Sequence, residues 1–283
     1  EGMVVNSSSN RARTARKMVF EMLSADQPAR ETSHDPDSKF WNWASDTGVT
    51  NSRLPQRLSP ELDQSHTAMR VNLDACIHCN LCVRACREVQ VNDVIGMAYR
   101  GHDAKIVFDF DDPMGDSTCV ACGECVQACP TGALMEASLL DENQTRVNYP
   151  DEQVASVCPY CGVGCQITYN LKDGKLLFVD GKEGPANRNR LCVKGRFGFD
   201  YVHHEHRLTV PLIRKDGVLK DAYEDVDPGN PYTHFREATW EEALDRAADG
   251  IRQIREEHGP RGLAGFGSAK ESNEEAYLVQ KLV

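Results

Sequence analysis

The sequence predicts an α+β fold that gives way to an α/β segment toward the C-terminal end. Two runs of four cysteines share one spacing, and two candidate strands lie between them. A third set of cysteines surrounds a strand–turn–strand pattern. After Pro211 the pattern changes to helix, strand and helix, which is typical of the start of a parallel sheet. These three observations divide the chain into four predicted regions.

Residues 1–70 are predicted to form one helix and a linker. Residues 11–24 have helical periodicity, and residues 25–65 are rich in Asp, Ser, Pro and Asn, which indicates a loop or extended linker. Within it, Trp41 and Trp43 could share one face of an extended segment, as a packing or subunit contact rather than a cofactor site. The side chains of the helix expected to be available for burial are Met18, Val19, Met22 and Leu23.

The twelve cysteines fall into three sets of four, with none left over. The first two sets repeat the spacing C-x2-C-x2-C-x3-C of two-cluster bacterial ferredoxins. In those proteins three thiolates of one tight loop bind three corners of a cubane, and the last cysteine of each run binds the other cluster. The predicted ligand sets are therefore Cys76, Cys79, Cys82 and Cys129 for one cluster, and Cys119, Cys122, Cys125 and Cys86 for the other.

Residues 71–150 should form this two-cluster, ferredoxin-like module. Strands are predicted at 94–99 and 105–110, and the repeated run indicates a pseudo-twofold arrangement. The core is small, so cluster binding must supply much of the folding energy. Pro130 follows the second run as the motif expects, whereas Arg87 stands in that place after the first.

Two other uses of cysteine compete with this interpretation. Disulfides suit small secreted chains, but this chain has 283 residues and closely clustered cysteines. Structural zinc uses C-x2-C pairs separated by a longer loop, an arrangement that the first two sets lack. Zinc is a stronger alternative to a four-iron cluster for the third cysteine set than for the first two.

Residues 151–212 are predicted to form a small, β-rich domain with a separate [4Fe-4S] site. Strand patterns at 166–171 and 175–181 flank Asp173-Gly174, which predicts a hairpin, and Gly162 and Gly164 let the backbone approach a cluster closely. The third cysteine set is Cys158, Cys161, Cys165 and Cys192. Positive charge gathers beside its last member at Arg188, Arg190, Lys194 and Arg196, which by charge alone indicates a solvated face.

Residues 213–283 have an ordinary α/β pattern. Thr239 and Glu242 form a T-x-x-E capping box that opens a helix through about Glu257. A strand is predicted at 262–267, followed by a second helix from about Glu271. The Gly-Phe-Gly within the strand is a weak sign of a nucleotide loop, because the third glycine of that motif is missing.

Composition limits the partners of the chain. The formal net charge of −11 disfavours nucleic-acid binding. No apolar run approaches the roughly 20 residues that cross a bilayer, so we expect no membrane anchor. Twelve reduced thiols fit a reducing compartment, which predicts a cytoplasmic location.

Several segments together resemble a known family. They are CPYCGVGC, LCVKGRFGFDYVHHEHRLTVPLIR, TWEEALDRAADGI and SAKESNEEAYLVQKLV, which are similar to the N-terminal part of molybdenum- or tungsten-bis-pterin oxidoreductases. With the ferredoxin-like module in front, the chain most resembles the catalytic alpha subunits of cytoplasmic NAD-dependent formate dehydrogenases. The resemblance implies that the third cysteine set binds the four-iron cluster nearest the pterin. It also implies that Lys194 lies between that cluster and the pterin, where it contacts the cofactor and assists electron transfer.

For the full-length parent the resemblance implies an oxidoreductase that converts formate to CO2. Its cofactors would be three [4Fe-4S] clusters and a Mo- or W-bis(molybdopterin guanine dinucleotide). Electrons would reach a partner subunit that carries flavin and iron–sulfur centres and reduces NAD. The resemblance also predicts that the chain is an N-terminal fragment: a two-iron ferredoxin domain would precede Glu1, and the residues that ligate the metal would follow Val283.

The chain departs from the family near its start, where Asp26-Gln27-Pro28 replaces a motif that supplies His and Cys ligands, so that cluster should be missing. His34 is then expected to be a solvated loop residue, and His203, His204 and His206 to be structural or surface residues. Two alternatives remain: the large iron–sulfur subunit of NADH dehydrogenase, and another bis-pterin enzyme such as a nitrate reductase. Lys194 and the intact CVKGRFG favour a working pterin site, and the two-cluster module argues against a nitrate reductase.

Overall fold

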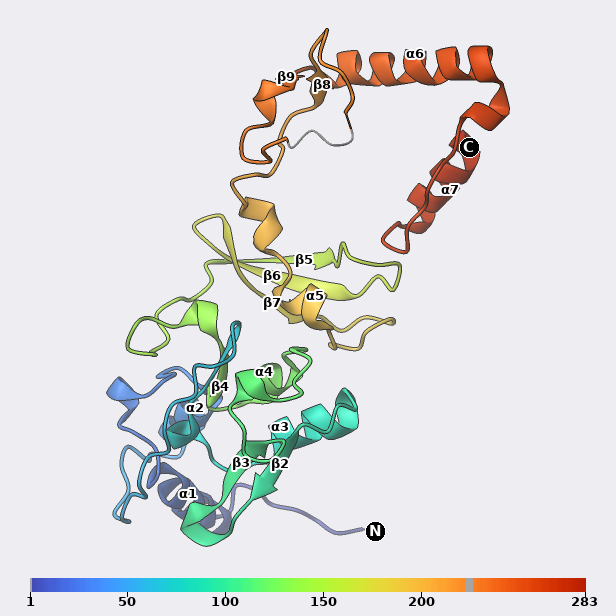
Figure 1. Ribbon diagram of the computed structural model, residues 1–283. Coiled ribbons are helices and arrows are strands. Elements are labelled where there is room, and N and C mark those ends of the chain that lie inside the picture. The colour runs from blue at the N-terminus through green and yellow to red at the C-terminus, as the bar shows by residue number, and fades with distance from the viewer. Residues whose placement is uncertain (1, 222–225) are drawn as a thin grey trace. The chain divides into compact units, whose positions relative to one another are not determined.

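The computed structural model describes residues 2–221 and 226–283 (Figure 1). The chain divides into two compact units. The first consists of Glu1–Cys158 and Cys165–Gly198, and the second of Pro159–Gly164 and Phe199–Val283. The first unit contains most of the sheet structure and all but one of the cysteines.

Helix α1 (Asn10–Ser24) confirms the helix predicted at the N-terminus. The Ser9 hydroxyl caps it by accepting a hydrogen bond from the backbone N–H of Ala12 at 3.2 Å. The buried face differs from expectation, because Leu23 packs with Phe20 against the next helix. Three other side chains expected to be available for burial are exposed, namely Met18, Val19 and Met22.

A second helix, α2 (Lys39–Asp46), lies within the stretch predicted as linker, so the prediction of an extended segment there is wrong. Ser38 caps this helix, and the spacing of Phe40, Trp41 and Ala44 builds an apolar stripe with helical period. Trp41 is 5% exposed and Trp43 is 46% exposed, so only the first packs in the core.

The region that carries the first two cysteine runs is built from two antiparallel strand pairs. Strand β2 (Ile95–Ala98) pairs with β3 (Lys105–Phe108), which confirms both predicted strands. Strand β1 (Met69–Val71) precedes the first run and pairs with β4 (Leu134–Glu136), which follows the second. Short helices α3 (Leu81–Arg84) and α4 (Glu124–Ala128) each carry a cysteine into the shared core.

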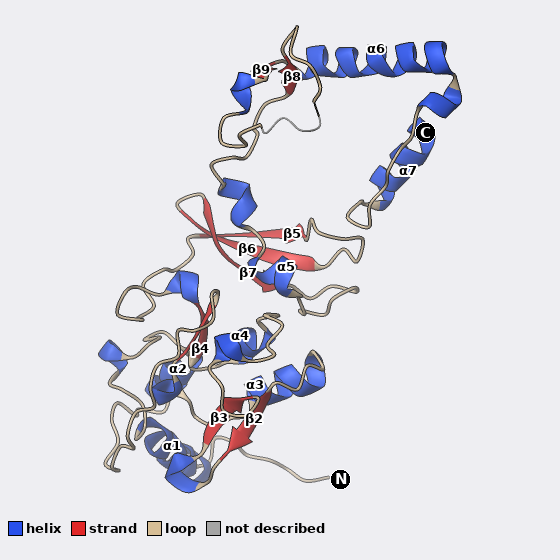
Figure 2. Cartoon of the chain, in the orientation of Figure 1, coloured by secondary structure: helices blue, strands red, loops and turns tan. Residues whose placement is uncertain are grey.

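A three-stranded antiparallel sheet completes the first unit (Figure 2). Strands β6 (Gln166–Lys172) and β7 (Lys175–Gly181) form the predicted hairpin. Its turn residues Asp173 and Gly174 have φ of 52° and 73°, as a type I′ turn requires. The outer strand β5 (Glu152–Val157) is exposed along its length, so alternation of polar and apolar residues gave no sign of it. Helix α5 (Val193–Phe197) follows Cys192.

Short helical turns connect these elements. In the first unit they are the 3-10 turns η1 (Arg30–Thr32), η2 (Leu73–Ala75), η4 (Gly101–Asp103), η5 (Met114–Asp116) and η6 (Ala137–Leu139), and the π-helical turn η3 (Ala85–Val89). In the second unit they are η7 (Asp200–His203), η8 (Pro231–Thr233) and η9 (Pro260–Gly262).

The second unit contains one strand pair and two longer helices. Strand β8 (Leu212–Arg214) pairs with β9 (Phe235–Glu237), and α6 (Trp240–His258) and α7 (Asn273–Leu282) confirm the two predicted helices. Thr239 caps α6 as predicted, but the carboxylate of Glu242 pairs with Arg236 instead of the cap backbone. The capping box with both of its bonds belongs to α7, between Ser272 and Glu275.

The strand predicted at 262–267 is wrong: the backbone there is irregular after η9. A strand needs a hydrogen-bonded neighbour, and none of the strand pairings among the described residues involves this segment. In the described part of the chain, no helix has the length and apolar character of a membrane span.

Candidate metal centres

The first predicted set of cysteines surrounds one small cavity in the first unit. Cys76 directly follows η2, Cys82 lies on α3, and Cys129 directly follows α4. Ile106, Ala133 and Leu134 give the cavity apolar walls. The fourth cysteine, Cys79, lines the cavity and is exposed to solvent. The cysteine from the second run therefore lies with the first three, as the crossed pattern requires.

The second set surrounds another small cavity in the same unit. Its lining contains Cys119, Cys122, Cys125 and, from the first run, Cys86. Cys86 and Cys125 are buried and the other two are half-buried, so this cavity lacks the exposed cysteine of the first. Val94 and Ile95 supply apolar walls.

The two loops share a backbone course. The residues two and four positions after the first cysteine are left-handed in both: His78 and Asn80 have φ of 54° and 61°, and Ala121 and Gly123 have φ of 53° and 71°. Non-glycine residues seldom adopt this conformation. Its repetition at matching positions indicates that each loop is shaped around its cysteines.

Hydrogen-bond donors point at the sulfur atoms. The backbone N–H groups of His78, Ala121 and Val94 donate to the Sγ atoms of Cys76, Cys119 and Cys86, each at 3.4 Å. The side-chain amide of Asn92 lies 3.9 Å from Cys122 Sγ, and the Thr131 hydroxyl lies 3.5 Å from Cys129 Sγ. Such donors stabilise negative charge on a thiolate and tune the potential of a bound cluster.

Burial raises the pKa of the thiols in the metal-free protein. It raises the pKa of Cys76 to about 11 and that of Cys82 to about 12, with repulsion from the neighbouring Cys129 as a further cause. Burial also raises the pKa of Cys125 well above its usual range. Ionised thiols clustered in these apolar cavities therefore need a cation to balance their negative charge. A four-iron cubane offers one iron atom to each of four thiolates.

The third set is divided between the two units. Cys158, Cys165 and Cys192 lie in the first unit, and Cys161 lies in the second. The N–H of Cys158 donates to the carbonyl of Cys165 at 2.8 Å. A Cβ at Gly195 would lie 3.5 Å from Cys158 Sγ, which places this thiol beside α5. The role of these four residues as one ligand set stays a prediction.

The charge of the basic segment beside Cys192 had suggested a solvated face. The segment is not uniformly solvated. Arg188, Arg190 and Lys194 are exposed, but Arg196 is 1% exposed. Its guanidinium donates to the carbonyls of Cys122 and Val179 and pairs with two carboxylates. Sequence reasoning missed this role, because an arginine in a basic run carries no local sign of burial.

Asn187 was missed as well. It is 7% exposed, and its side chain ties the loop before Cys192 to the start of β6. Its Oδ1 accepts from the N–H of Gln166 at 3.0 Å, and its Nδ2 donates to the carbonyls of Gln166 and Arg190 at 2.9 and 3.1 Å. This side chain thus shapes the approach to the last cysteine of the third set.

The prediction for His34 is wrong. It is 2% exposed, and burial lowers its pKa, so the ring is held neutral in the first unit instead of solvated in a loop. The backbone explains the position, because the carbonyl of His34 accepts from the N–H of Arg146 at 2.8 Å. His203, His204 and His206 are exposed in the second unit.

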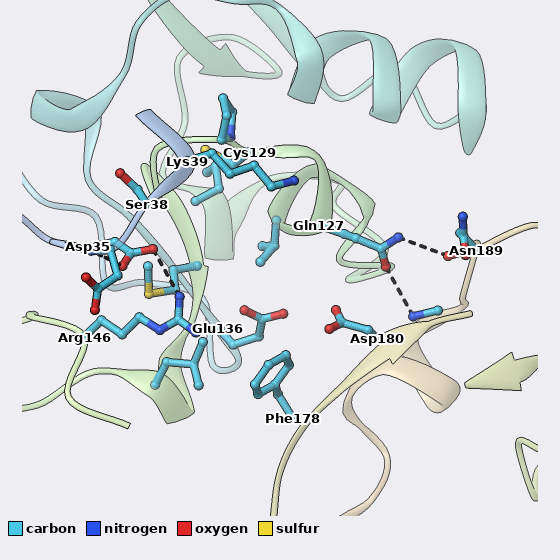
Figure 3. A pocket seen from close by; sticks show the side chains of 18 residues that line it. Asp35, Ser38, Lys39, Gln127, Cys129, Glu136, Arg146, Phe178, Asp180 and Asn189 are labelled. Carbon is cyan, nitrogen blue, oxygen red and sulfur yellow. Dashed lines mark hydrogen bonds and ion pairs between the residues drawn. The ribbon is translucent and has the colours of Figure 1, made fainter. Parts of the chain in front are cut away.

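A polar pocket of about 560 Å³ opens elsewhere in the first unit, and Cys129 contributes to its lining (Figure 3). The carboxylates of Glu136 and Asp180 lie near each other in it, while Arg146 pairs with Asp35 at 3.2 Å. Burial, with repulsion from Asp180 as a further cause, raises the pKa of Glu136 to about 6. Burial also raises the pKa of Asp180.

Over residues 2–221 and 226–283, no group of three or more His, Cys, Asp or Glu side chains has the arrangement that holds a metal ion. The four thiols of a cubane site each bind a different iron, so they need not converge on one point.

Three family comparisons cover most of the chain. Residues 75–133 match the 4Fe-4S dicluster domain, residues 151–204 the Molybdopterin oxidoreductase Fe4S4 domain, and residues 207–283 the Molybdopterin oxidoreductase family. The class is thereby defined: the chain carries the iron–sulfur domains of a molybdopterin oxidoreductase.

Individual relatives point in the same direction. The chain is 36% identical over 256 residues to "Probable oxidoreductase YjgC" of Bacillus subtilis (strain 168), covering 78% of this chain and 24% of the relative. It is 29% identical over 319 aligned positions to a "Putative formate dehydrogenase" of Staphylococcus aureus (strain USA300), covering 99% of this chain and 31% of the relative. The chain thus spans 24% and 31% of the length of these two relatives.

Among solved structures, an NAD+-reducing [NiFe]-hydrogenase in the H2-reduced state is 26% identical and matches with a TM-score of 0.41. The match covers 46% of this chain and 57% of the other. A TM-score this low supports no conclusion about fold or function.

Proposed function

We propose that the chain is the iron–sulfur electron-transfer portion of a formate dehydrogenase that oxidises formate to CO2. The observation that carries the proposal is the pair of cavities, each lined by three cysteines of one run and the last cysteine of the other. The relative called formate dehydrogenase, aligned over 99% of this chain, supports the choice of substrate.

The residues present fit four-iron clusters. Each cavity has four thiols, apolar walls and N–H donors directed at sulfur. A disulfide-braced fold would pair these cysteines with one another, yet none of the twelve, all of which lie in the described part of the chain, forms a disulfide. We propose Cys76, Cys79, Cys82 and Cys129 as one ligand set, Cys119, Cys122, Cys125 and Cys86 as the second, and Cys158, Cys161, Cys165 and Cys192 as the third.

Bound four-iron clusters would supply one-electron transfer between fixed positions. The positions of the chain's own residues then suggest the order in which electrons pass through the three cluster sites. Segment 189–196, which contains Cys192, contacts the second loop through Arg196 and Cys122 at 3.3 Å. Cys79 of the first set is exposed. We propose that electrons pass from the third set to the second, and leave through the first.

Lys194 is proposed to lie between the third cluster and a molybdenum or tungsten bis(molybdopterin guanine dinucleotide). It is exposed on α5, two residues after Cys192, so its ammonium group is available to a neighbouring cofactor. The match of residues 207–283 to the Molybdopterin oxidoreductase family supports the presence of that cofactor in the whole protein. A flavin- and iron–sulfur-containing subunit that reduces NAD is the proposed electron acceptor.

The test uses the anaerobically purified full-length protein with its natural partners. We expect molybdenum or tungsten, an iron content that includes about twelve atoms for these three clusters in addition to the iron of other domains and subunits, and NAD reduction that depends on formate. Iron without either metal or pterin would contradict the proposal and favour an electron-transfer subunit without its own substrate, such as the iron–sulfur subunit of an NADH dehydrogenase. A metal–pterin protein that reduces nitrate but does not oxidise formate would favour a nitrate reductase.

Lys194→Ala tests the role of the lysine. We expect formate-dependent NAD reduction to fall about tenfold or more, because the charge between two redox centres is lost, while iron and molybdenum or tungsten contents stay unchanged. Lys175→Ala is the matched control, since this exposed lysine lies in the β6–β7 hairpin. Equal rates for both variants would remove Lys194 from the proposed path.

A further inference from the structure

Arg196 is the largest side chain in the structure's set of fully buried residues. It lies on α5, four residues after Cys192, yet its guanidinium reaches the second cysteine loop. Its Nε donates to the carbonyl of Cys122 at 3.3 Å, and its Nη1 donates to the carbonyl of Val179 at 3.2 Å. One side chain thus joins the second loop, β7 and the helix that follows the third set.

Two carboxylates accompany this charge. Glu124 Oε2 lies 3.7 Å from Nη2, and Asp180 Oδ1 lies 3.5 Å from Nη1. Glu124 is 9% exposed, directly precedes Cys125 and lies two residues after Cys122 in the sequence. Buried charges are stable only when paired and hydrogen-bonded, so removal of Arg196 would leave Glu124 uncompensated beside the second cavity.

The second loop leaves space for Arg196. Gly123 has φ of 71°, and a Cβ at this position would lie 2.8 Å from Arg196 Cγ and 2.9 Å from Nε. The matching position of the first loop holds Asn80, with φ of 61° and an exposed side chain. The two loops therefore have the same backbone, but Arg196 lies over the second at Gly123. The side chain of Arg57, which is 6% exposed, contacts the first loop at a different place, where its Nη1 lies 3.1 Å from His78 Nε2.

Neighbouring contacts hold this arrangement in place. The side-chain amide of Gln90 donates to the carbonyl of Leu191 at 3.1 Å, and that of Gln127 donates to the carbonyl of Asn189 at 3.3 Å. Gln127 also accepts from the N–H of Gly181 at 3.3 Å. Of the three side chains that make these cross-contacts, Gln90, Gln127 and Arg196, only Arg196 carries a charge.

We propose that Arg196 is a positioning residue that raises the reduction potential of the cluster held by Cys86, Cys119, Cys122 and Cys125. The inference rests on the proposed ligand set. Reduction adds one negative charge to a four-iron cluster, and a buried cation nearby favours that charged state. Arg196 supplies the cation, polarises the Cys122 carbonyl and neutralises Glu124. The first loop has the exposed Asn80 at the matching place, and its largely buried cation, Arg57, lies instead beside His78.

The experiment measures midpoint potentials by EPR-monitored redox titration of the anaerobic, full-length holoprotein. Arg196→Met keeps most of the volume and removes the charge. We expect the potential of one cluster to become more negative, with iron content unchanged and the other clusters unaffected. Arg196→Lys, which retains the charge, should restore most of the shift. Arg190→Met is the control, because Arg190 is an exposed arginine of the same segment and should change nothing.

Cys86→Ala identifies the affected signal, because it should abolish the EPR signal whose potential Arg196→Met shifts. An unchanged potential in Arg196→Met, with full iron, would overturn the inference, as would a shift confined to a signal that survives in Cys86→Ala. If wild-type protein contains no four-iron clusters, the proposed function itself fails. If the wild-type protein contains the clusters but Arg196→Met leaves their potentials unchanged, this inference fails and the proposed function still stands.

A second substitution keeps the inference testable if Arg196→Met does not retain iron. Glu124→Gln removes the negative partner and leaves Arg196 in place, so the same potential should become more positive. The double variant Arg196→Met/Glu124→Gln removes both charges and should return the potential toward the wild-type value. A Glu124→Gln protein with full iron and an unchanged potential would contradict the inference by itself.

Discussion

The two cysteine loops, residues 76–86 and 119–129, follow the same backbone course in different surroundings. Both place left-handed residues at matching positions and both direct N–H groups at sulfur. The first loop exposes Cys79, whereas the second has Arg196 against Gly123. The cysteine spacing thus sets the shape of a loop, while residues far away in the sequence set the electrostatics of the site it forms.

The ends of the two runs differ for a local reason. Pro130 cannot continue a helix, and α4 ends at Ala128 with Cys129 in extended conformation. Arg87 imposes no such stop, and the chain runs from α3 into the π-helical turn η3, which contains Cys86. Both routes bring the last cysteine to the opposite cavity. The departure at Arg87 therefore changes the path of the chain and leaves the crossed arrangement intact.

The largest expected effect comes from removing cysteines in pairs. Cys86→Ala/Cys119→Ala removes two ligands of one proposed cluster, so we expect a loss of about four iron atoms per chain. Cys86→Ala/Cys79→Ala removes one ligand from each cluster and should lose about eight. Iron and acid-labile sulfide analysis of the full-length protein measures both losses.

The two pairs control for each other, since each changes two cysteines and both include Cys86. If each run bound its own cluster without crossing, the pattern would reverse: the pair with Cys79 would lose about four iron atoms and the pair with Cys119 about eight. That reversal would refute the crossed ligand sets.

The next effect compares matching backbone positions. Gly123→Ala puts a Cβ at positive φ and against Arg196, so we expect a loss of about 2–4 kcal/mol in the free energy of unfolding. Asn80→Ala is opposed only by the positive φ of this position, so it should lower the free energy of unfolding by about 1 kcal/mol. Thermal unfolding of the two holoproteins gives the order of stability. Equal shifts in Tm would mean that Arg196 does not constrain the second loop.

The smallest effect concerns the strand pairs that flank the loops. The β1–β4 pair carries the buried Glu136, whose pKa is raised by burial from 4.5 to about 6, whereas β2 carries no ionisable residue. Between these two pH values the folded state binds more protons than the unfolded state. The free energy of unfolding should therefore fall by about 2 kcal/mol as pH rises through this window.

Glu136→Gln removes this titration. We expect a higher Tm than wild type at pH 7 and a flatter dependence of Tm between pH 5 and 7, measured by thermal unfolding. Glu142→Gln is the control, because Glu142 is exposed in the loop after β4. Parallel pH profiles for wild type and Glu136→Gln would show that Glu136 ionises normally in the folded protein.

The sequence predicted what depends on local patterns. The β2 and β3 strands, the β6–β7 hairpin, α6 and α7 all follow from periodicity, turn residues or caps. The two crossed sets of cysteines line two separate cavities because their spacing encodes a repeated loop. Their metal-binding roles, like those of the third set and Lys194, stay predictions.

What the sequence did not predict depends on distant contacts. Arg196 and His34 become buried because other segments close over them, and neither has a local sign of burial. The sequence did not predict helix α2, because the polar residues around it indicated a linker. Conversely, residues 262–267 have the composition of a strand, yet a strand forms only where another strand pairs with it. Tertiary context overrode local preference in each case.

The exchange of cysteines between the two runs also determines how the module would respond to a cut in its chain. The turn between β2 and β3 is exposed at Tyr99, Arg100 and Gly101. A protease that nicked it would leave β2 with one piece and β3 with the other, still paired edge to edge. Cys86 would remain seated in the partner piece's cavity and Cys129 in the other. Because strand pairing and the exchanged cysteines both join the two pieces, cutting the connecting loop would not by itself separate them.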